Sequence, residues 1–446
     1  ILSIGVIFLL AIILRLSHID FISLWNDELY TLCHISDMGS ALNLKNTFLD
    51  PGNPPLFFII SNIWLLFFNK SIILIRILPF IISIFGIYSI YFVIRKILNK
   101  KTALIASFLS SINLFMICEA NEIRSYVLSM ALLIWGLYYF YKLRNNFSYK
   151  NLIIYTLISI LLVNIHYYCV LYVLFNFIFG VFLFKNKIKF LISNCFIGLS
   201  FLPYFILANK HALSEGFNSW IEKPDFSVLN NHIIFYFGNI LFFILIVLFC
   251  AWIYKKLSRR QKTIFLYTNL SIAFVFVAAF MISILIKPIL FERYFCIFLP
   301  FLIINTSIFL SLKLNPIILT LIFLLSVSMP EYENYNLFSN INFSLEYALE
   351  DNKNYSDWNI YYIIPDSIDY IKYFPEIDKN KVIVSNFGVR EDVDLINYYL
   401  SKIPQKEKII LYSPEICINS RIKFSQNLNV KKIDTTFVPI YKIVLE

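Results

Sequence analysis

Charged residues are scarce in this chain of 446 residues: they make up 15%, against 59% hydrophobic and 18% aromatic residues. With a mean hydropathy of +0.72, this composition excludes a soluble globular protein and predicts a polytopic membrane protein. The net charge of +10 does not indicate a nucleic-acid partner. The basic residues lie in short clusters between apolar runs, as in cytoplasmic loops, and no nucleic-acid motif is present.

Several familiar patterns are also missing. The seven cysteines lack the CxxC and Cys/His spacings of zinc sites and mostly fall within apolar runs, so we expect packing residues. The sequence has no internal repeat and no matched pair of broken helices, which argues against a transporter. No small-residue cleavage site follows the first apolar run, so we expect a retained span rather than a signal peptide.

Apolar runs predict about 11 transmembrane helices, because a helical span needs ~20 mostly apolar residues. The runs lie near 1–17, 76–94, 102–117, 125–141, 151–164, 167–184, 189–208, 233–254, 263–286, 294–311 and 315–329. Basic clusters occupy every second loop, which the positive-inside rule makes cytoplasmic. The run from Asn53 to Phe68 breaks this alternation, so we expect a helix lying in the outer interface.

Acidic residues are absent from all of the basic loops. Eleven of the 28 acids precede residue 331, and all of them lie in the other loops, so we expect extracytoplasmic chemistry. Asp27 and Glu28 follow the first span, and a carboxylate near hydrocarbon is usually kept for a function. The structural alternative is that they begin a helix, since acids suit a helix N-terminus.

The character of the chain changes at Pro330. Short β-rich runs at 359–364, 381–385, 408–412 and 438–445 alternate with helical patterns at 367–374 and 391–403. This alternation predicts a small C-terminal α/β domain. We therefore expect a transmembrane domain over 1–330 and an extracytoplasmic α/β domain over 331–446, with a supporting or acceptor-docking role.

A set of short motifs resembles a known family. The segments are Arg15-Leu16, Leu24-Trp25-Asn26-Asp27-Glu28, Asn53-Pro54-Pro55-Leu56, Arg76-Ile77-Leu78-Pro79, Glu122-Ile123-Arg124-Ser125-Tyr126, His166-Tyr167-Tyr168 and Arg293-Tyr294. Their order and shared placement resemble the polyprenyl-phosphate-sugar-dependent glycosyltransferases of the GT-C fold, which include protein O-mannosyltransferases and lipid A aminoarabinose transferases. The resemblance covers roughly residues 10–310. Asn53 departs from it, because many members have His or Lys at that position.

The resemblance implies a catalytic base and a phosphate site. Asp27 would take the acceptor's proton as general base, and Glu28 would hold an Arg, orient the acceptor or bind a metal. The leaving lipid phosphate needs fixed cations, for which Arg124, Arg293 and Lys287 are the candidates. The other candidate substrate-binding residues are Glu122, Tyr126, His166, Tyr168 and Tyr294.

Each of these residues also has a structural interpretation. Basic residues at span ends snorkel to the interface, and tyrosines gather in interfacial belts. His166 could bind phosphate or a metal, and a structural role for this histidine explains its position equally well. We expect Arg15 to pair with an acid of the first outer segment.

The sequence thus predicts an inverting membrane glycosyltransferase with an extracytoplasmic active site. Its partners would be a polyprenyl-phosphate-linked sugar donor, membrane lipid, and a glycan, lipid or protein acceptor. No cofactor is required by the sequence, which leaves a divalent metal open. Abundant isoleucine, asparagine and lysine are typical of AT-rich bacterial genomes, so we expect the bacterial cytoplasmic (inner) membrane. The alternatives are a lipid-linked glycan transporter or flippase, a non-catalytic membrane scaffold, and a glycan polymerase or ligase.

Overall fold

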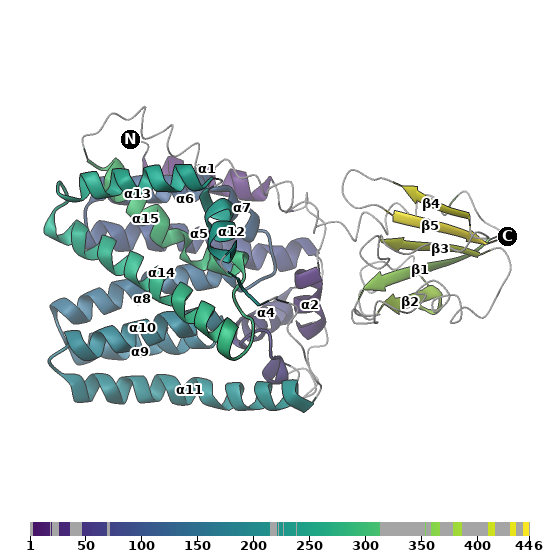
Figure 1. Ribbon diagram of the computed structural model, residues 1–446, viewed down its shortest axis with the longest axis horizontal. Helices are drawn as coiled ribbons and strands as arrows, with labels where there is room; N and C mark the ends of the chain where they lie inside the picture. Colours follow the sequence, from purple (N-terminus) through teal and green to yellow (C-terminus); the bar gives the residue numbers. More distant parts are fainter. Residues whose placement is uncertain are drawn as a thin grey trace. The chain divides into compact units, whose positions relative to one another are not determined.

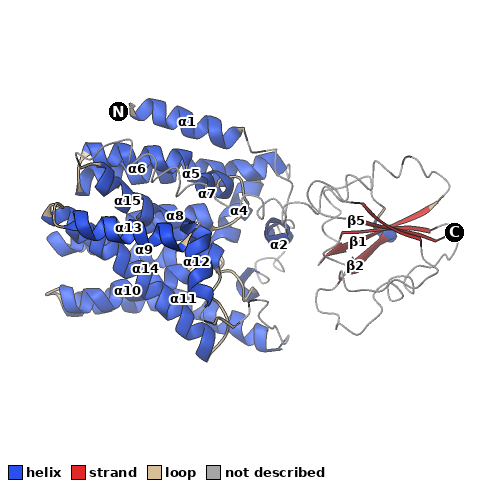
Figure 2. Ribbon diagram, turned by 45° about the horizontal axis from the view of Figure 1, so that its top comes forward, coloured by secondary structure: helices blue, strands red, loops and turns tan. Residues whose placement is uncertain are grey.

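The computed structural model of the chain divides into two compact units. Residues 1–20 and 34–330 form the first, and residues 21–33 and 331–446 form the second. Strands occur in the second unit, while the first is helical (Figure 2). The structure describes residues 3–17, 19, 26–35, 47–68, 72–214, 221, 223–225, 227–237, 239–312, 353, 358–365, 378–385, 409–414, 429–433 and 440–445.

Helices, many of them antiparallel to the next helix along the chain, build the first unit (Figure 1). They are α1 (Ile4–Leu16), α4 (Leu56–Phe67), α5 (Ile72–Ile97), α6 (Lys100–Ile112), α7 (Leu114–Glu119), α8 (Tyr126–Asn145), α9 (Tyr149–Val163), α10 (Tyr167–Leu183), α11 (Lys187–Ser214), α12 (Ser227–Phe237), α13 (Ile240–Tyr254), α14 (Arg259–Leu285), the 3-10 helix η1 (Glu292–Phe298) and α15 (Leu299–Leu310).

Five of the described helical segments are long and apolar enough to cross a membrane. They cover 73–97, 126–145, 187–213, 259–285 and 292–310, and shorter apolar helices cover 4–16, 56–67, 149–163 and 167–183. The protein is therefore a multi-pass membrane protein. The helix expected after Asn53 is α4, whereas the expected span at 315–329 lies outside the described residues.

Two expected spans are divided, which corrects the sequence-based prediction. The run 102–117 breaks into α6 and α7 at Asn113, whose side chain accepts a hydrogen bond from the Met116 N–H and so caps α7. The run 233–254 breaks into α12 and α13 after Phe237. Asparagine competes for backbone donors in this way, and the capped end then begins a new helix.

Small residues and buried hydrogen bonds hold the helices together. α6 packs on α1, α5 and α15, and its buried residues include Ala103, Ala106 and Ser107, whose small side chains allow a close approach of helices. A Cβ on Gly180 of α10 would lie 2.5 Å from the Phe190 ring of α11, so that contact requires glycine.

Arg15 is a second correction. Its guanidinium is fully buried and donates to Ser83 Oγ at 2.9 Å, to the Ser111 and Ser110 carbonyls at 3.0 Å each, and to the carbonyls of Ala11 and Met116. The partners of Arg15 are therefore backbone carbonyls and one hydroxyl, rather than the expected acid. The last carbonyls of α6 have no partner within the helix, and they carry its negative dipole end, which explains the arginine.

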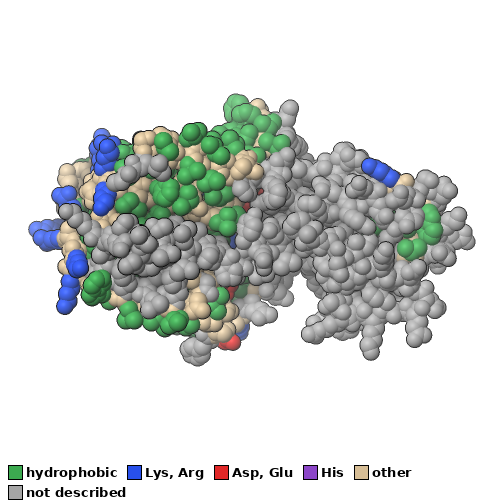
Figure 3. Space-filling view, turned by 90° about the horizontal axis from the view of Figure 1, so that it is seen from above, with side chains coloured by type: hydrophobic (Ala, Val, Ile, Leu, Met, Phe, Trp, Pro, Cys, Tyr) green, Lys and Arg blue, Asp and Glu red, His purple; other side chains and the backbone are tan. Residues whose placement is uncertain are grey.

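Charge separates the two ends of the helical unit. The turns α5–α6, α8–α9, α10–α11 and α13–α14 carry exposed lysines and arginines, which gather at one end of the helical unit (Figure 3). The C-termini of α9 and α14 and the N-termini of α8 and α10 lie at the other end, because the helices alternate in direction. The acids Glu119, Glu122 and Glu292 belong to this second end.

The second unit contains most of α2 (Asn26–Ile35) and a five-stranded sheet. Its strands are β1 (Asn359–Pro365), β2 (Val382–Ser385), β3 (Ile409–Pro414), β4 (Asn429–Ile433) and β5 (Ile440–Leu445), in the order β2-β1-β3-β5-β4. β1 pairs in parallel with β2 and β3, and β5 pairs antiparallel with β3 and β4. Four strands match the predicted runs, β4 was missed, and the helices expected at 367–374 and 391–403 lie outside the described residues.

Candidate functional site

The segment between α7 and α8 is a buried charged turn rather than an open loop. Glu119 is 1% exposed, Glu122 3% and Arg124 7%, and the Arg124 N–H donates to the Glu122 carbonyl at 2.8 Å. Burying charges is costly unless they are paired and hydrogen-bonded. The turn therefore needs a basic partner from elsewhere in the fold.

Arg293 of η1 supplies that partner. Its Nε lies 3.3 Å from Glu119 Oε1, and one of its terminal nitrogens bonds Glu122 Oε2. Arg293 is 8% exposed, so this arginine bridges two carboxylates in a setting that is closed to bulk water. Residues more than 170 positions apart in sequence thus form one ion cluster.

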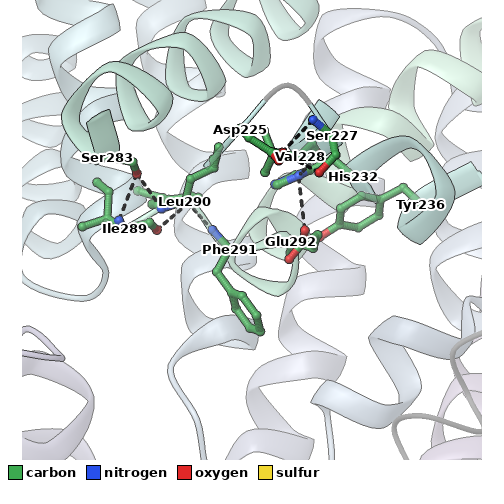
Figure 4. Close-up of polar contacts among 11 residues, drawn as sticks. Asp225, Ser227, Val228, His232, Tyr236, Ser283, Ile289, Leu290, Phe291 and Glu292 are labelled. Carbon is green, nitrogen blue, oxygen red and sulfur yellow. Dashed lines mark hydrogen bonds and ion pairs between the residues drawn. The ribbon is translucent and has the colours of Figure 1, made fainter. Parts of the chain in front are cut away.

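The loop before η1 is fixed by hydroxyl groups. The Ser283 Oγ accepts from the Ile289 and Leu290 N–H groups at 2.9 Å each (Figure 4). The Tyr168 hydroxyl donates to the Ile289 carbonyl at 3.0 Å and accepts from the Phe291 N–H at 3.3 Å. These contacts define where η1 begins and therefore where Arg293 lies.

α12 supports the same loop from another side. The Tyr236 hydroxyl donates to the Glu292 carbonyl at 2.8 Å, and His232 Nδ1 lies 3.8 Å from Glu292 Oε1 (Figure 4). Asp225 begins α12, because its carboxylate accepts from the Ser227 N–H at 2.8 Å. None of these α12 residues was singled out from the sequence, since tyrosines and histidines in apolar runs carry no signal of their partners.

Tyr126 joins the two arginines. The guanidinium carbon of Arg293 lies 5.1 Å from the centre of the Tyr126 ring, and that of Arg124 lies 5.9 Å from it. Both distances are within the range of cation–π attraction. Two guanidinium groups thus share one buried tyrosine ring.

Three further aromatic rings complete this wall. His166 lies 5.7 Å from Tyr126, 5.6 Å from Tyr168 and 5.4 Å from Tyr294, measured between ring centres. Tyr168 and Tyr294 are also in contact, at 5.7 Å. The structure therefore brings together the Glu-x-Arg-x-Tyr, His-Tyr-Tyr and Arg-Tyr segments that the sequence suggested.

His166 also has a structural role as the N-cap of α10. Its Nδ1 accepts from the Tyr168 N–H at 3.2 Å, so the proton of the neutral ring is assigned to Nε2. Burial, together with the nearby charge of Arg124, lowers the pKa of His166 to about 3. The imidazole is consequently an uncharged hydrogen-bond donor at neutral pH.

The first outer segment docks beside this wall through residues 50–56. The Leu56 N–H donates to the Asn164 carbonyl at 2.9 Å, and the hydroxyls of Tyr167 and Tyr204 donate to the carbonyls of Pro51 and Asp50 at 3.1 and 2.8 Å. Arg124 Nη2 donates to Asn53 Oδ1 at 3.3 Å. The segment Asn53-Pro54-Pro55 is thus a direct neighbour of the cluster.

The remaining candidate residues are Lys287, Glu28 and Asp27. Lys287 is exposed, and within the described ranges no hydrogen bond or ion pair joins its side chain to the cluster. Glu28 is buried and Asp27 half-buried in the first turn of α2, where the Thr31 hydroxyl donates to the Asp27 carbonyl at 2.9 Å. α2 begins with these two acids, as a helix N-terminus favours. Both belong to the second unit.

Glu119 is the main residue of the cluster that sequence reasoning did not select. Its signal was present, since Glu119 and Glu122 are three residues apart and an arginine follows two positions later. No group of three or more histidine, cysteine or acidic side chains arranged for a metal occurs in the described part of the chain.

Comparison with solved structures identifies the fold. The chain is similar to ArnT from Cupriavidus metallidurans in the apo state, with a TM-score of 0.55, 10% sequence identity and coverage of 99% of this chain and 97% of that chain. The expected polytopic GT-C-like fold is thereby confirmed. At this identity the likeness concerns the fold alone.

Two further structures align less closely. The same ArnT bound to undecaprenyl phosphate has a TM-score of 0.49 at 9% identity, covering 99% of this chain and 97% of that chain. The Archaeoglobus fulgidus oligosaccharyltransferase in complex with Zn and sulfate has 0.47 at 12% identity, covering 92% and 68%. No protein-family model and no curated protein sequence matches the chain.

Proposed function

We propose that the protein is an integral-membrane glycosyltransferase that moves a sugar from a polyprenyl-phosphate donor to a glycan, lipid or protein acceptor. The observation that carries the proposal is the cluster in which Arg124 and Arg293 share the Tyr126 ring, on a fold similar to that of ArnT. The cluster lies at the end of the helices opposite the basic turns. The positive-inside rule assigns the basic turns to the cytoplasm, so the end with the cluster is proposed to be extracytoplasmic. The bacterial cytoplasmic membrane is the proposed location.

The chemistry follows from how the bond breaks. Negative charge develops on the lipid phosphate as the sugar leaves, and fixed guanidinium groups stabilise that charge without having to reorient. Glu119 and Glu122 hold Arg293 in one orientation before the donor arrives, while the Tyr126 ring positions both arginines. The Nε2–H of His166 is a neutral donor on the same wall and adds no charge of its own.

Attack on the anomeric carbon needs a base for the acceptor's proton. Asp27 is the proposed base and Glu28 a proposed partner for the acceptor, an arginine or a metal. A single displacement by one acceptor inverts the configuration at the anomeric carbon. This assignment rests on the motif around Asp27 and on the scarcity of acids.

The test uses the purified protein in lipid nanodiscs with a panel of labelled polyprenyl-phosphate sugars. Wild type is compared with Asp27→Asn and with the matched control Asp225→Asn, which keeps an exposed capping residue of α12. We expect donor binding by all three proteins and loss of transfer in Asp27→Asn only. Equal turnover in all three removes Asp27 from the chemistry. Failure of the wild type to bind any donor contradicts the transferase and favours a scaffold, whereas transport of the donor without its consumption favours a flippase.

A further inference from the structure

The Asp50–Asn53 turn links a carboxylate to the candidate phosphate site. Asp50 is 3% exposed, and its carboxylate accepts from the Gly52 N–H at 2.7 Å and from Asn53 Nδ2 at 3.4 Å. The hydroxyl oxygens of Tyr167 and Tyr204 lie 2.8 Å apart, and the two hydroxyls hold the backbone of this turn through the carbonyls of Pro51 and Asp50. The turn is therefore fixed both by its own side chain and by α10 and α11.

Asn53 uses both ends of its side-chain amide. Nδ2 donates to Asp50, and Oδ1 accepts from Arg124 Nη2 at 3.3 Å. A primary amide is the short side chain that offers a donor and an acceptor side by side. The two neighbours fix which way the amide points, with its oxygen toward the cation and its nitrogen toward the anion.

We propose that Asn53 is a positioning residue for Arg124, holding the guanidinium in place for the phosphate of the donor. This inference rests on the proposed function, because it specifies how that phosphate site is ordered. The contact orients Arg124 through a neutral oxygen, so it does not offset the guanidinium charge as a carboxylate would. Asp50 fixes the amide, and the tyrosine pair fixes Asp50.

Other side chains at position 53 would behave differently, which gives the proposal its test. Alanine removes both hydrogen bonds and releases one restraint on Arg124. Aspartate would hold Arg124 more tightly but would add a negative charge beside both Asp50 and the incoming phosphate. Asn53→Ala should therefore lose both the restraint on Arg124 and phosphate affinity, whereas Asn53→Asp should keep the restraint and lose the affinity.

The first measurement reads the restraint without any activity. The rate at which phenylglyoxal modifies Arg124 is followed by peptide mass spectrometry in wild type, Asn53→Ala, Asn53→Asp and the exposed control Asn209→Ala. We expect modification about tenfold faster in Asn53→Ala, which corresponds to about 1.4 kcal/mol, and no acceleration in Asn53→Asp or the control. An unchanged rate in Asn53→Ala overturns the proposal.

The second measurement is the affinity for polyprenyl phosphate in nanodiscs. We expect weakening of about tenfold in Asn53→Ala and a larger loss in Asn53→Asp, although Arg124 stays restrained there. Wild-type affinity in Asn53→Asp overturns the proposal. If the wild type binds no polyprenyl phosphate, the proposed function fails, while the modification rates still decide the role of Asn53. If Asn53→Ala does not fold, Asp50→Asn replaces it, because it weakens the other end of the same bridge and should accelerate modification of Arg124.

Discussion

Arg293 is held by two acids from a distant turn, and burial makes each partner depend on the other. Removing one member of a buried ion pair leaves an uncompensated charge, which costs about 3–5 kcal/mol. Removing both Glu122 and Arg293 costs less than the sum, because the double change leaves one carboxylate, Glu119, without its arginine, whereas removing Arg293 alone leaves two. The cluster should therefore behave as one unit in unfolding experiments.

A double-mutant cycle tests this coupling. We expect Glu122→Gln and Arg293→Gln each to lower the free energy of unfolding, and the double variant to lose less than the two losses added. Unfolding in detergent, followed by circular dichroism, gives the three values. Strict additivity would mean that the Arg293–Glu122 contact contributes no coupling energy.

His166 gives a pH dependence whose sign follows from its burial. Its folded-state pKa of about 3 lies below the unfolded value of about 6.5, so the unfolded state takes up a proton first as the pH falls. The stability associated with neutral His166 is complete above pH ~6.5 and is lost progressively at lower pH. We expect the unfolding temperature of wild type to fall more between pH 7.5 and pH 5 than that of His166→Asn, which keeps an N-cap acceptor. Equal falls in the two proteins would contradict the assignment.

At the scale of single residues, the motifs predicted the members of the cluster better than their partners. Arg124, Tyr126, His166 and Arg293 were selected because the segments that contain them resemble motifs of the GT-C glycosyltransferases. Their neighbours were not foreseen, because Glu119 meets Arg293 only through the fold, and Asp50 is joined to Arg124 only through Asn53. A sequence pattern can indicate a cation for a phosphate, but not which buried carboxylate balances it.

At the scale of helices, Arg15 shows how a buried cation joins elements. Its guanidinium connects α1 to Ser83 of α5, to the last carbonyls of α6 and to Met116 of α7. We expect Arg15→Met to lower the unfolding temperature, because each lost bond to the charged group costs about 1.5–3 kcal/mol. Arg15→Lys should recover only part of the loss, since an ammonium cannot reproduce the planar fork. Wild-type unfolding temperatures in both variants would contradict a structural role.

The apolar runs located the helices, because length and hydropathy define a span without knowledge of the packing. They did not show the interruptions at Asn113 and after Phe237, where single polar residues end one helix and begin another. β4 was missed because its own sequence does not indicate a strand. Its sequence, Asn-Val-Lys-Lys-Ile, is too polar to stand out, and pairing with β5 rather than its own pattern makes it a strand.

At the scale of the whole helical unit, charge segregation predicts orientation. Asn186 and Asn209 are exposed residues of the turn before α11 and of α11 itself, 23 helical residues or about 35 Å apart. That distance exceeds the ~30 Å of bilayer hydrocarbon. In a chain without its native cysteines, we expect an impermeant maleimide to label Asn209→Cys in intact cells and Asn186→Cys only after permeabilisation. The reverse pattern would place the ion cluster on the cytoplasmic side.

The membership of residues 21–33 in the second unit has a consequence for biosynthesis. The segment with Asp27 leaves the ribosome early, yet the strands of its compact unit are made last. At ~5–20 residues per second, translation of the intervening chain takes on the order of 15–60 s. During that interval the membrane helices can insert and assemble before the strands of the second unit have been synthesised. A ribosome that stalls before Glu331 would release a membrane-inserted protein whose Asp27 segment has no unit to join.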